Sequence, residues 1–383
     1  IPTIFMALAI MVFVAGSPKY KCVPPEGSIL ERAVLLCYEA LWTRRSVPLS
    51  GAVKQKLDRA ALSNGGSFSG VEVHGMKLVA RIAPFLTALI GYWAIYSQLA
   101  TSFQNQACQM DLSLGGTEVP VSALQSFDTI AILILVPIFD VYIYPALEKN
   151  SMGLSMLQRM GLGFVFAALS MLVAGFVELS RLHNAPPPGG YSDPTARANI
   201  SPCQNIDDYN PTNYQKWVAG YDDTDEPQYC SLVDACTVTT VAFGATVPVL
   251  QCISCNNIIQ TSSLSVFAQV PQFLLVGTSE VLTSITSLQF FYSQAPIAMR
   301  SVSQALNLFM TALGSWVIIP LLLLVNANKS DQWVPANLDD GHLDYYFFLL
   351  AGLMVLNHIY FGWLSRDYVY IKESDFEALH EGS

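Results

Sequence analysis

Residues 265–291 read SVFAQVPQFLLVGTSEVLTSITSLQFF, and this stretch contains a single charged residue, Glu280. A helix needs roughly 20 residues to cross a hydrocarbon core that is about 30 Å thick, so we predict that the stretch spans a membrane. Glu280 then lies ~22 Å along the helix from Ser265, inside the hydrocarbon zone. A charge at such a depth costs about 2.5–3.5 kcal/mol on insertion scales, so we expect Glu280 to have a function.

Five more stretches are apolar and long enough to cross a membrane. They are Leu78–Phe103, Pro120–Ala146, Met160–Val177, Ser303–Val325 and Tyr345–Leu364. Only 13% of the 383 residues are charged, against about 25% in ordinary soluble domains. The mean hydropathy is +0.40. We therefore predict an all-α, multi-pass protein of the plasma membrane or an internal membrane. The net charge of −10 argues against a nucleic-acid partner.

The distribution of basic residues predicts how the helices are oriented. Residues 15–81 contain ten Lys and Arg residues, and cytoplasmic loops hold an excess of these residue types, so this segment is expected in the cytoplasm. The resulting organisation is 1–14, the end of a truncated transmembrane helix; 15–77, a cytoplasmic linker; 78–179, three transmembrane helices; 180–264, an extracytoplasmic insert; 265–364, three more transmembrane helices; and 365–383, a cytoplasmic tail.

The cytoplasmic linker contains apolar residues at helical spacing beside charged ones. This pattern predicts an amphipathic helix over Ser28–Thr43. Such a helix either lies on the membrane surface or packs as an ordinary linker helix without lipid contact, and the sequence leaves both open.

The cysteines gather on the side of the membrane that we expect to be oxidising. Five of the eight lie in the insert, and Cys108 lies at the outer end of the first full span. The even number on this side predicts disulfides, whose pairing the sequence does not assign. The spacing of Cys252 and Cys255 also suits metal or redox chemistry, but one such pair without a second favours a disulfide or a free thiol.

Three more side chains within the spans are placed to share a cavity with Glu280. Asp128 lies eight residues into the second full span, and Trp93 and Ser97 lie fifteen and nineteen residues into the first. Each has a structural interpretation too: Glu280 as a buried carboxylate bonded to a neighbouring helix, and Asp128 and Trp93 as packing residues. Asp140 lies near a span end, where its side chain can reach water.

Longer motifs resemble a known family. The segments are GTSEV at 277–281, LQFFYSQAP at 288–296 and MRS at 299–301, with YSQ at 96–98, ALQSF at 123–127, PIFD at 137–140 and LQRMGLG at 157–163. They closely resemble the signature of the proton-coupled oligopeptide transporters, the peptide and nitrate branch of the major facilitator superfamily, and plant members especially. The resemblance implies the C-terminal six-helix bundle of that fold, with the N-terminal bundle missing. Only the insert lies outside it.

The resemblance also implies a set of substrate-binding residues. They are Glu280, Asp128, Trp93, Tyr96, Ser97 and Gln98. Glu280 matches the acid that receives the α-ammonium group of a peptide. Asp128 stands where the family usually has Asn, and Ser97 where bacterial and animal peptide carriers have an acid, which leaves the preferred substrate charge open. Tyr96 stands where a nitrate-carrying relative has His, which favours peptide.

The function that the resemblance implies is proton-coupled symport of di- or tripeptides by alternating access, with no cofactor and with protons as the coupling ion. The expected partners are this small-molecule substrate, the lipid bilayer and the missing N-terminal bundle. A nitrate or other small-solute carrier of the same family and a non-transporting nutrient receptor are the alternatives. An enzyme is not expected, because the sequence has no Ser-His-Asp order, HExxH motif or paired metal spacing.

Overall fold

The computed structural model describes residues 2–17, 29–43, 55–114, 117–151, 153–185, 261–328, 332–335 and 338–371, with four short strands between residues 235 and 253. The chain divides into two compact units, Ile1–Met76 and Lys77–Ser383, and each is described by itself. The five cysteines predicted in the insert fall outside the described side chains, whereas Cys108 is disulfide-bonded.

The first unit contains a helix at the position of the predicted truncated span, α1, and the short helices of the predicted linker. They are α1 (Pro2–Gly16), α2 (Ile29–Tyr38), the π-helix η2 (Glu39–Thr43), and the 3₁₀ helices η3 (Lys56–Ala60) and η4 (Leu62–Asn64). Together, α2 and η2 occupy the range in which an amphipathic helix was expected. Leu36 and Ala40 on their buried face pack against Ala60, Ala61 and Phe68, so much of the apolar stripe is used inside the linker. Contact of the opposite face with lipid stays a prediction.

The second unit contains most of the membrane helices. The described residues include six helical segments long and apolar enough to span a membrane, namely Gly70–Cys108, Val121–Lys149, Met156–His183, Val266–Ser293, Arg300–Val325 and Leu343–Ser365. The six predicted stretches coincide with them, so the prediction of an all-α, multi-pass membrane protein is confirmed. The third segment is longer than predicted, because Ser155 and Gln158 form a capping box that starts its helix at Met156.

Several spans are built from more than one helical element. The helices are α3 (Gly70–Tyr96), η5 (Ser97–Ala100), α4 (Ser102–Cys108), η6 (Val121–Leu124), α5 (Gln125–Ile138), η7 (Phe139–Ile143), α6 (Tyr144–Lys149), α7 (Met156–His183), η10 (Val266–Gln269), α9 (Val270–Glu280), η11 (Val281–Ile285), α10 (Thr286–Ser293), η12 (Ile297–Met299), α11 (Arg300–Val325), η13 (Leu338–Asp340) and α12 (Leu343–Ser365). The strands form antiparallel pairs, β1 (Ser113–Leu114) with β2 (Thr117–Glu118), β3 (Ala235–Cys236) with β6 (Cys252–Ile253), and β4 (Thr239–Ala242) with β5 (Ala245–Pro248).

Two spans contain a π-helical turn, and both turns follow residues of interest. The turn η7 comes just after Pro137, which has no N–H to donate to the helix. The turn η11 begins directly after Glu280. Insertions of this kind in α-helices are frequent at functional sites. The break therefore coincides with the charged residue that the sequence singled out.

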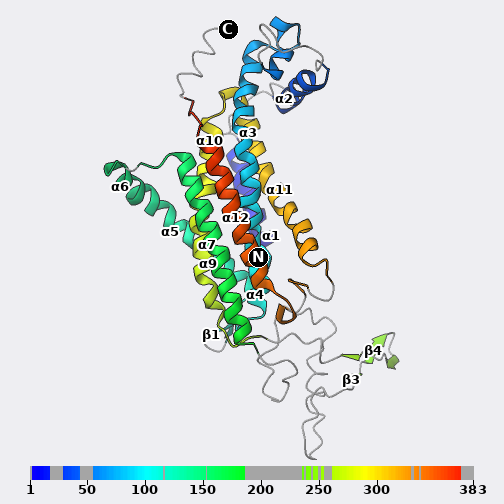
Figure 1. The fold of residues 1–383 in the computed structure, drawn as a ribbon. Coiled ribbons are helices and arrows are strands. Elements are labelled where there is room, and N and C mark those ends of the chain that lie inside the picture. The colour runs from blue at the N-terminus through cyan, green and yellow to red at the C-terminus, as the bar shows by residue number, and fades with distance from the viewer. Residues whose placement is uncertain are drawn as a thin grey trace, which may run out of the picture. The chain divides into compact units, whose positions relative to one another are not determined.

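The core lies where α7 runs between α12 and α9 (Figure 1). Rings interlock through it: Phe164 of α7 stacks on Tyr92 of α3 at 5.7 Å between ring centroids, and it meets Phe361 of α12 at 4.9 Å. Gly163 faces Thr283 and Ser279, and a methyl group there would collide with the Thr283 hydroxyl. Small residues let membrane helices approach closely, so α7 and the α9–η11 segment are packed backbone to backbone.

A buried ion pair closes one end of α7. The Arg181 guanidinium contacts the Glu178 carboxylate at 2.7 Å, and both side chains are 0% exposed. Asp339 of η13 contacts the same guanidinium at 2.6 Å, and the Gln106 amide of α4 donates to Glu178 at 2.8 Å. These bonds join α7 to α4 and η13. These bonds could not be predicted from the sequence, because charges at a span end suggest a solvated boundary.

Removing either Arg181 or Glu178 should lower the stability of the protein. We expect Arg181→Met to lower the free energy of unfolding by about 3–5 kcal/mol, because Glu178 would stay buried without its counter-charge. Denaturant unfolding of the purified protein in detergent measures the change. The double variant Glu178→Leu/Arg181→Met should recover part of the loss. A single variant within about 0.5 kcal/mol of the parent would show that the pair is not needed.

Candidate functional site

Glu280 lies at the junction of α9 and the π turn η11, in the middle of a membrane span. Its side chain is half-buried, and its Oε2 atom is buried without a hydrogen-bond partner. A buried carboxylate oxygen without a donor carries its full desolvation cost, so such an atom calls for an explanation. A ligand that brings a donor to Oε2 would supply one.

Asp128 of α5 faces α9, the helix that carries Glu280. A methyl group at Gly277 of α9 would lie 3.1 Å from Asp128 Oδ1 and 2.9 Å from Ala131 Cβ, so the two helices touch at this glycine. Gly277 and Glu280 are three residues apart, and residues at that spacing lie on one helix face, roughly 5–6 Å apart at Cβ. The two carboxylates are close enough for the charge of Glu280 to act on Asp128. Asp128 is 4% exposed, and its Oδ1 atom has no hydrogen-bond partner.

Two aromatic residues of α3 complete this cluster. The Tyr96 hydroxyl lies near the Glu280 carboxylate. The Trp93 ring meets the Tyr96 ring edge-on at 5.3 Å between centroids, and its buried Nε1 atom has no partner. On the other side of Trp93, Gly314 brings the backbone of α11 close, because a methyl group there would lie 2.5 Å from Trp93 Cβ. The residues of the cluster therefore come from α3, α5 and α9, and α11 packs against Trp93.

A cavity of about 690 Å³ adjoins the cluster. Its wall includes four of the predicted site residues, Trp93, Tyr96, Ser97 and Gln98, but neither Asp128 nor Glu280. Tyr96 lines this cavity and also lies near both carboxylates.

Some polar side chains of the cavity wall are already hydrogen-bonded within the protein. The Ser97 hydroxyl donates to the Ala94 carbonyl oxygen at 2.7 Å. Gln98 is fully buried; its amide donates to Ala94, and its oxygen accepts from Ser102 at 2.7 Å and from Tyr346 at 3.4 Å. Gln98 therefore holds η5 in place more than it offers atoms to a ligand. The side chains best placed to meet a ligand are those of Trp93 and Tyr96.

Two further polar residues of the wall were missed by sequence reasoning. Thr311 and Ser315 of α11 line the cavity together with the apolar Ile318 and Leu322. Thr311 and Ser315 are four residues apart, so they lie on one helix face. The same span also contains Ser303, Gln304 and Asn307, so the sequence alone does not distinguish Thr311 and Ser315 as cavity residues.

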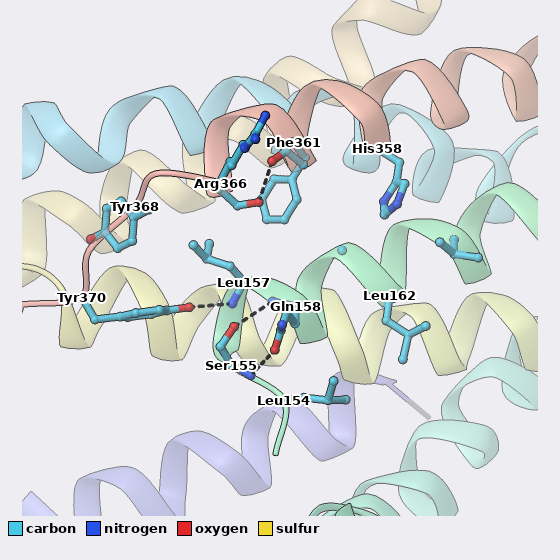
Figure 2. Close-up of a pocket in the computed structure, with 14 residues that line it drawn as sticks. Leu154, Ser155, Leu157, Gln158, Leu162, His358, Phe361, Arg366, Tyr368 and Tyr370 are labelled. Carbon is cyan, nitrogen blue, oxygen red and sulfur yellow. Dashed lines mark hydrogen bonds between the residues drawn. The ribbon is translucent and has the colours of Figure 1, made fainter. Parts of the chain in front are cut away.

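A second cavity, also of about 690 Å³, lies between the start of α7 and the end of α12 (Figure 2). The Leu157 N–H donates to the Tyr370 hydroxyl at 3.0 Å, and the Tyr368 hydroxyl and the Ile371 N–H both donate to the Gln294 side-chain oxygen, at 3.0 and 2.9 Å. The segment after α12 is thus bonded to α7 and to the residue that follows α10. None of the predicted site residues lines this cavity.

Burial favours the protonated, neutral form of the Tyr368 hydroxyl in that segment. Burial raises the pKa of the Tyr368 hydroxyl well above its usual range, and the opposing effect of the nearby Arg81 guanidinium is smaller. The guanidinium lies over the ring, 5.2 Å from its centroid. Tyr368 therefore keeps its proton and its hydrogen bond to Gln294 at physiological pH.

The family model described as PTR2, the POT family, matches residues 1–210 and 233–334, which is most of the chain. The chain belongs to the POT family. The family to which the sequence motifs pointed is thereby confirmed.

Curated relatives of this POT-family chain come from a plant. Protein NRT1/PTR FAMILY 8.3 of Arabidopsis thaliana is 30% identical over 93% of the chain and 57% of its own length. Protein NRT1/PTR FAMILY 8.1 is 29% identical over 97% of the chain and 61% of its own length. The chain thus spans less than two thirds of the length of these relatives.

Two solved structures show the same fold. A structure described as an auto inhibited POT family peptide transporter has a TM-score of 0.57 and 16% identity, over 97% of this chain and 64% of that one. The POT family transporter PepTSo has a TM-score of 0.55 and 20% identity, over 96% of this chain and 64% of that one. The six spans therefore adopt the helical arrangement of POT family transporters.

The contact of α5 with α9 in this POT-family chain depends on a glycine. Ala for Gly in a helix usually stabilises by about 1 kcal/mol, but we expect Gly277→Ala to destabilise by about 1–3 kcal/mol, because the methyl group collides with Ala131 and crowds Asp128. Thermal unfolding in detergent measures the difference. The control is Gly352→Ala, at a helical position where a methyl group meets nothing within 4 Å. Equal stability changes in both variants would contradict close packing at Gly277.

Proposed function

We propose that the protein is a proton-coupled symporter that carries di- or tripeptides across a membrane by alternating access. The observation that carries this proposal is the Glu280 carboxylate, which lies mid-span with a buried and unpartnered Oε2 atom beside Tyr96. The α-ammonium group of a peptide has three donors and a positive charge. It would satisfy this oxygen and offset the cost of keeping an anion away from water.

The neighbouring residues suit a peptide-binding role. We assign to Tyr96 the orientation of the Glu280 carboxylate, and to Trp93 a flat apolar wall with one free N–H donor. Asp128 is a second acid at the amino end of the substrate. The adjoining cavity gives room for the rest of the molecule, with Ser97 at its wall and Gln98 supporting η5.

The charge distribution favours a cationic group over nitrate at this site. Residues 82–148, 217–299 and 301–328 contain no Lys, Arg or His, and these ranges cover α5, α9, α10, the part of α3 after Arg81 and all of α11 after Arg300. A small anion would meet two acids and no base there. Nitrate transport is therefore the weaker candidate, although the curated relatives carry names that cover both branches.

The proposal includes a partner for the apolar outer faces of the bundle. Leu133 and Ile134 of α5 and Leu323 and Leu324 of α11 are exposed. The lipid bilayer and the N-terminal helical bundle that family members carry would cover such faces. Proton coupling is also proposed on family grounds, with no cofactor required.

Glu280 supplies the first test. In the complete protein, we expect Glu280→Gln to reduce uptake of a labelled dipeptide to background, because the neutral amide gives the α-ammonium group no counter-charge. Surface expression, measured in parallel, should not change. The matched control is Asp140→Asn, an exposed acid in the second span, which should retain uptake. Undiminished uptake by Glu280→Gln would refute the anchoring role.

Competition separates peptide from nitrate. Uptake of labelled dipeptide by the parent protein should fall when unlabelled dipeptide is added, and it should be insensitive to the same concentration of nitrate, because the site has no cation to hold an anion. The reverse pattern, with nitrate as competitor or as the transported solute, would favour the small-solute carrier.

A further inference from the structure

The binding site contains two acids where a zwitterionic peptide needs only one. Asp128 and Glu280 extend from neighbouring helices whose backbones meet at Gly277, and each has a buried oxygen without a hydrogen-bond partner. An ion pair with either would need a base nearby. The described ion pairs of the second unit join Arg181 to Glu178 and Asp339, at one end of α7.

The elements packed around the two acids offer no compensating charge. Neither α5 nor the α9–α10 span contains a Lys, Arg or His, and the titratable groups that α3 directs to them are the hydroxyls of Tyr92 and Tyr96. The bases of α7, Arg159, Arg181 and His183, lie in its first and last turns. When the two carboxylates are ionised, the positive charge at this site therefore comes from a bound cation.

Charge balance then distinguishes one class of peptide from another. The α-ammonium group of a neutral dipeptide compensates one carboxylate and leaves the other uncompensated in a low-dielectric site. A lysine or arginine as the first residue brings a second positive charge on a long, flexible side chain attached to the same residue. Its two charges match two carboxylates, that of Glu280 and that of Asp128, which approaches α9 at Gly277, three residues before Glu280.

We infer that Asp128 and Glu280 form a paired acidic subsite that selects di- and tripeptides with a basic first residue. This inference rests on the proposed function and names the substrate class of the same site. Glu280 holds the α-ammonium group, and Asp128 holds the side-chain cation. In this role Asp128 determines specificity, because an uncharged amide at position 128 would leave the site with one acid.

The parent protein provides a test without any substitution. Uptake of labelled Ala-Ala is measured in competition with unlabelled Lys-Ala, Ala-Lys and Ala-Ala. We expect half-inhibition by Lys-Ala at a concentration about tenfold lower than by Ala-Ala, the ratio that 1.4 kcal/mol of added binding energy gives. Ala-Lys has the same net charge, so it controls for general attraction, and it should compete less well than Lys-Ala. Equal competition by all three would overturn the inference while leaving peptide transport intact.

The variant Asp128→Asn tests whether Asp128 causes the preference for Lys-Ala. The ratio between Lys-Ala and Ala-Ala should fall to about one in this variant, whatever its absolute rate of uptake, and the tenfold ratio should persist in the control Asp140→Asn. Persistence of the ratio in Asp128→Asn would also overturn the inference. If Asp128→Asn fails to reach the membrane, the comparison of Lys-Ala with Ala-Lys in the parent still decides. A parent protein that takes up no dipeptide would refute the proposed function instead.

Discussion

The absence of water from the hydrocarbon core is the constraint on which this structure depends. Each backbone polar group must be satisfied within the protein, so the spans are helical, and the buried side-chain polar groups are mostly bonded as well. The glutamines show this: the Gln106 side-chain oxygen accepts from Gln269 at 2.8 Å and from Gln272 at 3.2 Å. Several buried oxygens of the described residues lack a donor, including those of Gln269, Gln272 and Asp344. The unpartnered oxygens of Asp128 and Glu280 differ from these because they belong to two acids on helices that touch at Gly277.

Helix packing brings these acids together. The small residue Gly277 lets α5 approach α9, while Gly314 brings α11 up to Trp93. The π turn η11 then interrupts regular hydrogen bonding directly after Glu280. The site therefore combines close backbone contact on one side with an irregular backbone on the other. Both acids thus lie at this junction, each with a buried oxygen that has no hydrogen-bond partner.

Much of the fold could be predicted from the sequence, because length and apolar character decide which segments cross a membrane. The lone acid in residues 265–291 was visible for the same reason. The Glu178–Arg181 pair was missed, since only the tertiary structure shows that both residues are buried between helices. The wall residues Thr311 and Ser315 were missed because hydroxyl groups are common in membrane helices, and only packing shows which of them border a cavity. The π turns also depend on tertiary contacts that no local pattern encodes.

The bonds that hold the segment after α12 have a mechanical consequence. Tyr370 fastens this segment to α7, and Tyr368 and Ile371 fasten it to Gln294. Any hinge that parted α12 from α7 would have to break these links together with the ring contact between Phe164 and Phe361. The two helices therefore form a stiff frame. The frame also extends to α3, because the Asn357 amide of α12 donates to the Ala88 carbonyl oxygen at 2.8 Å and Tyr92 stacks on Phe164 of α7.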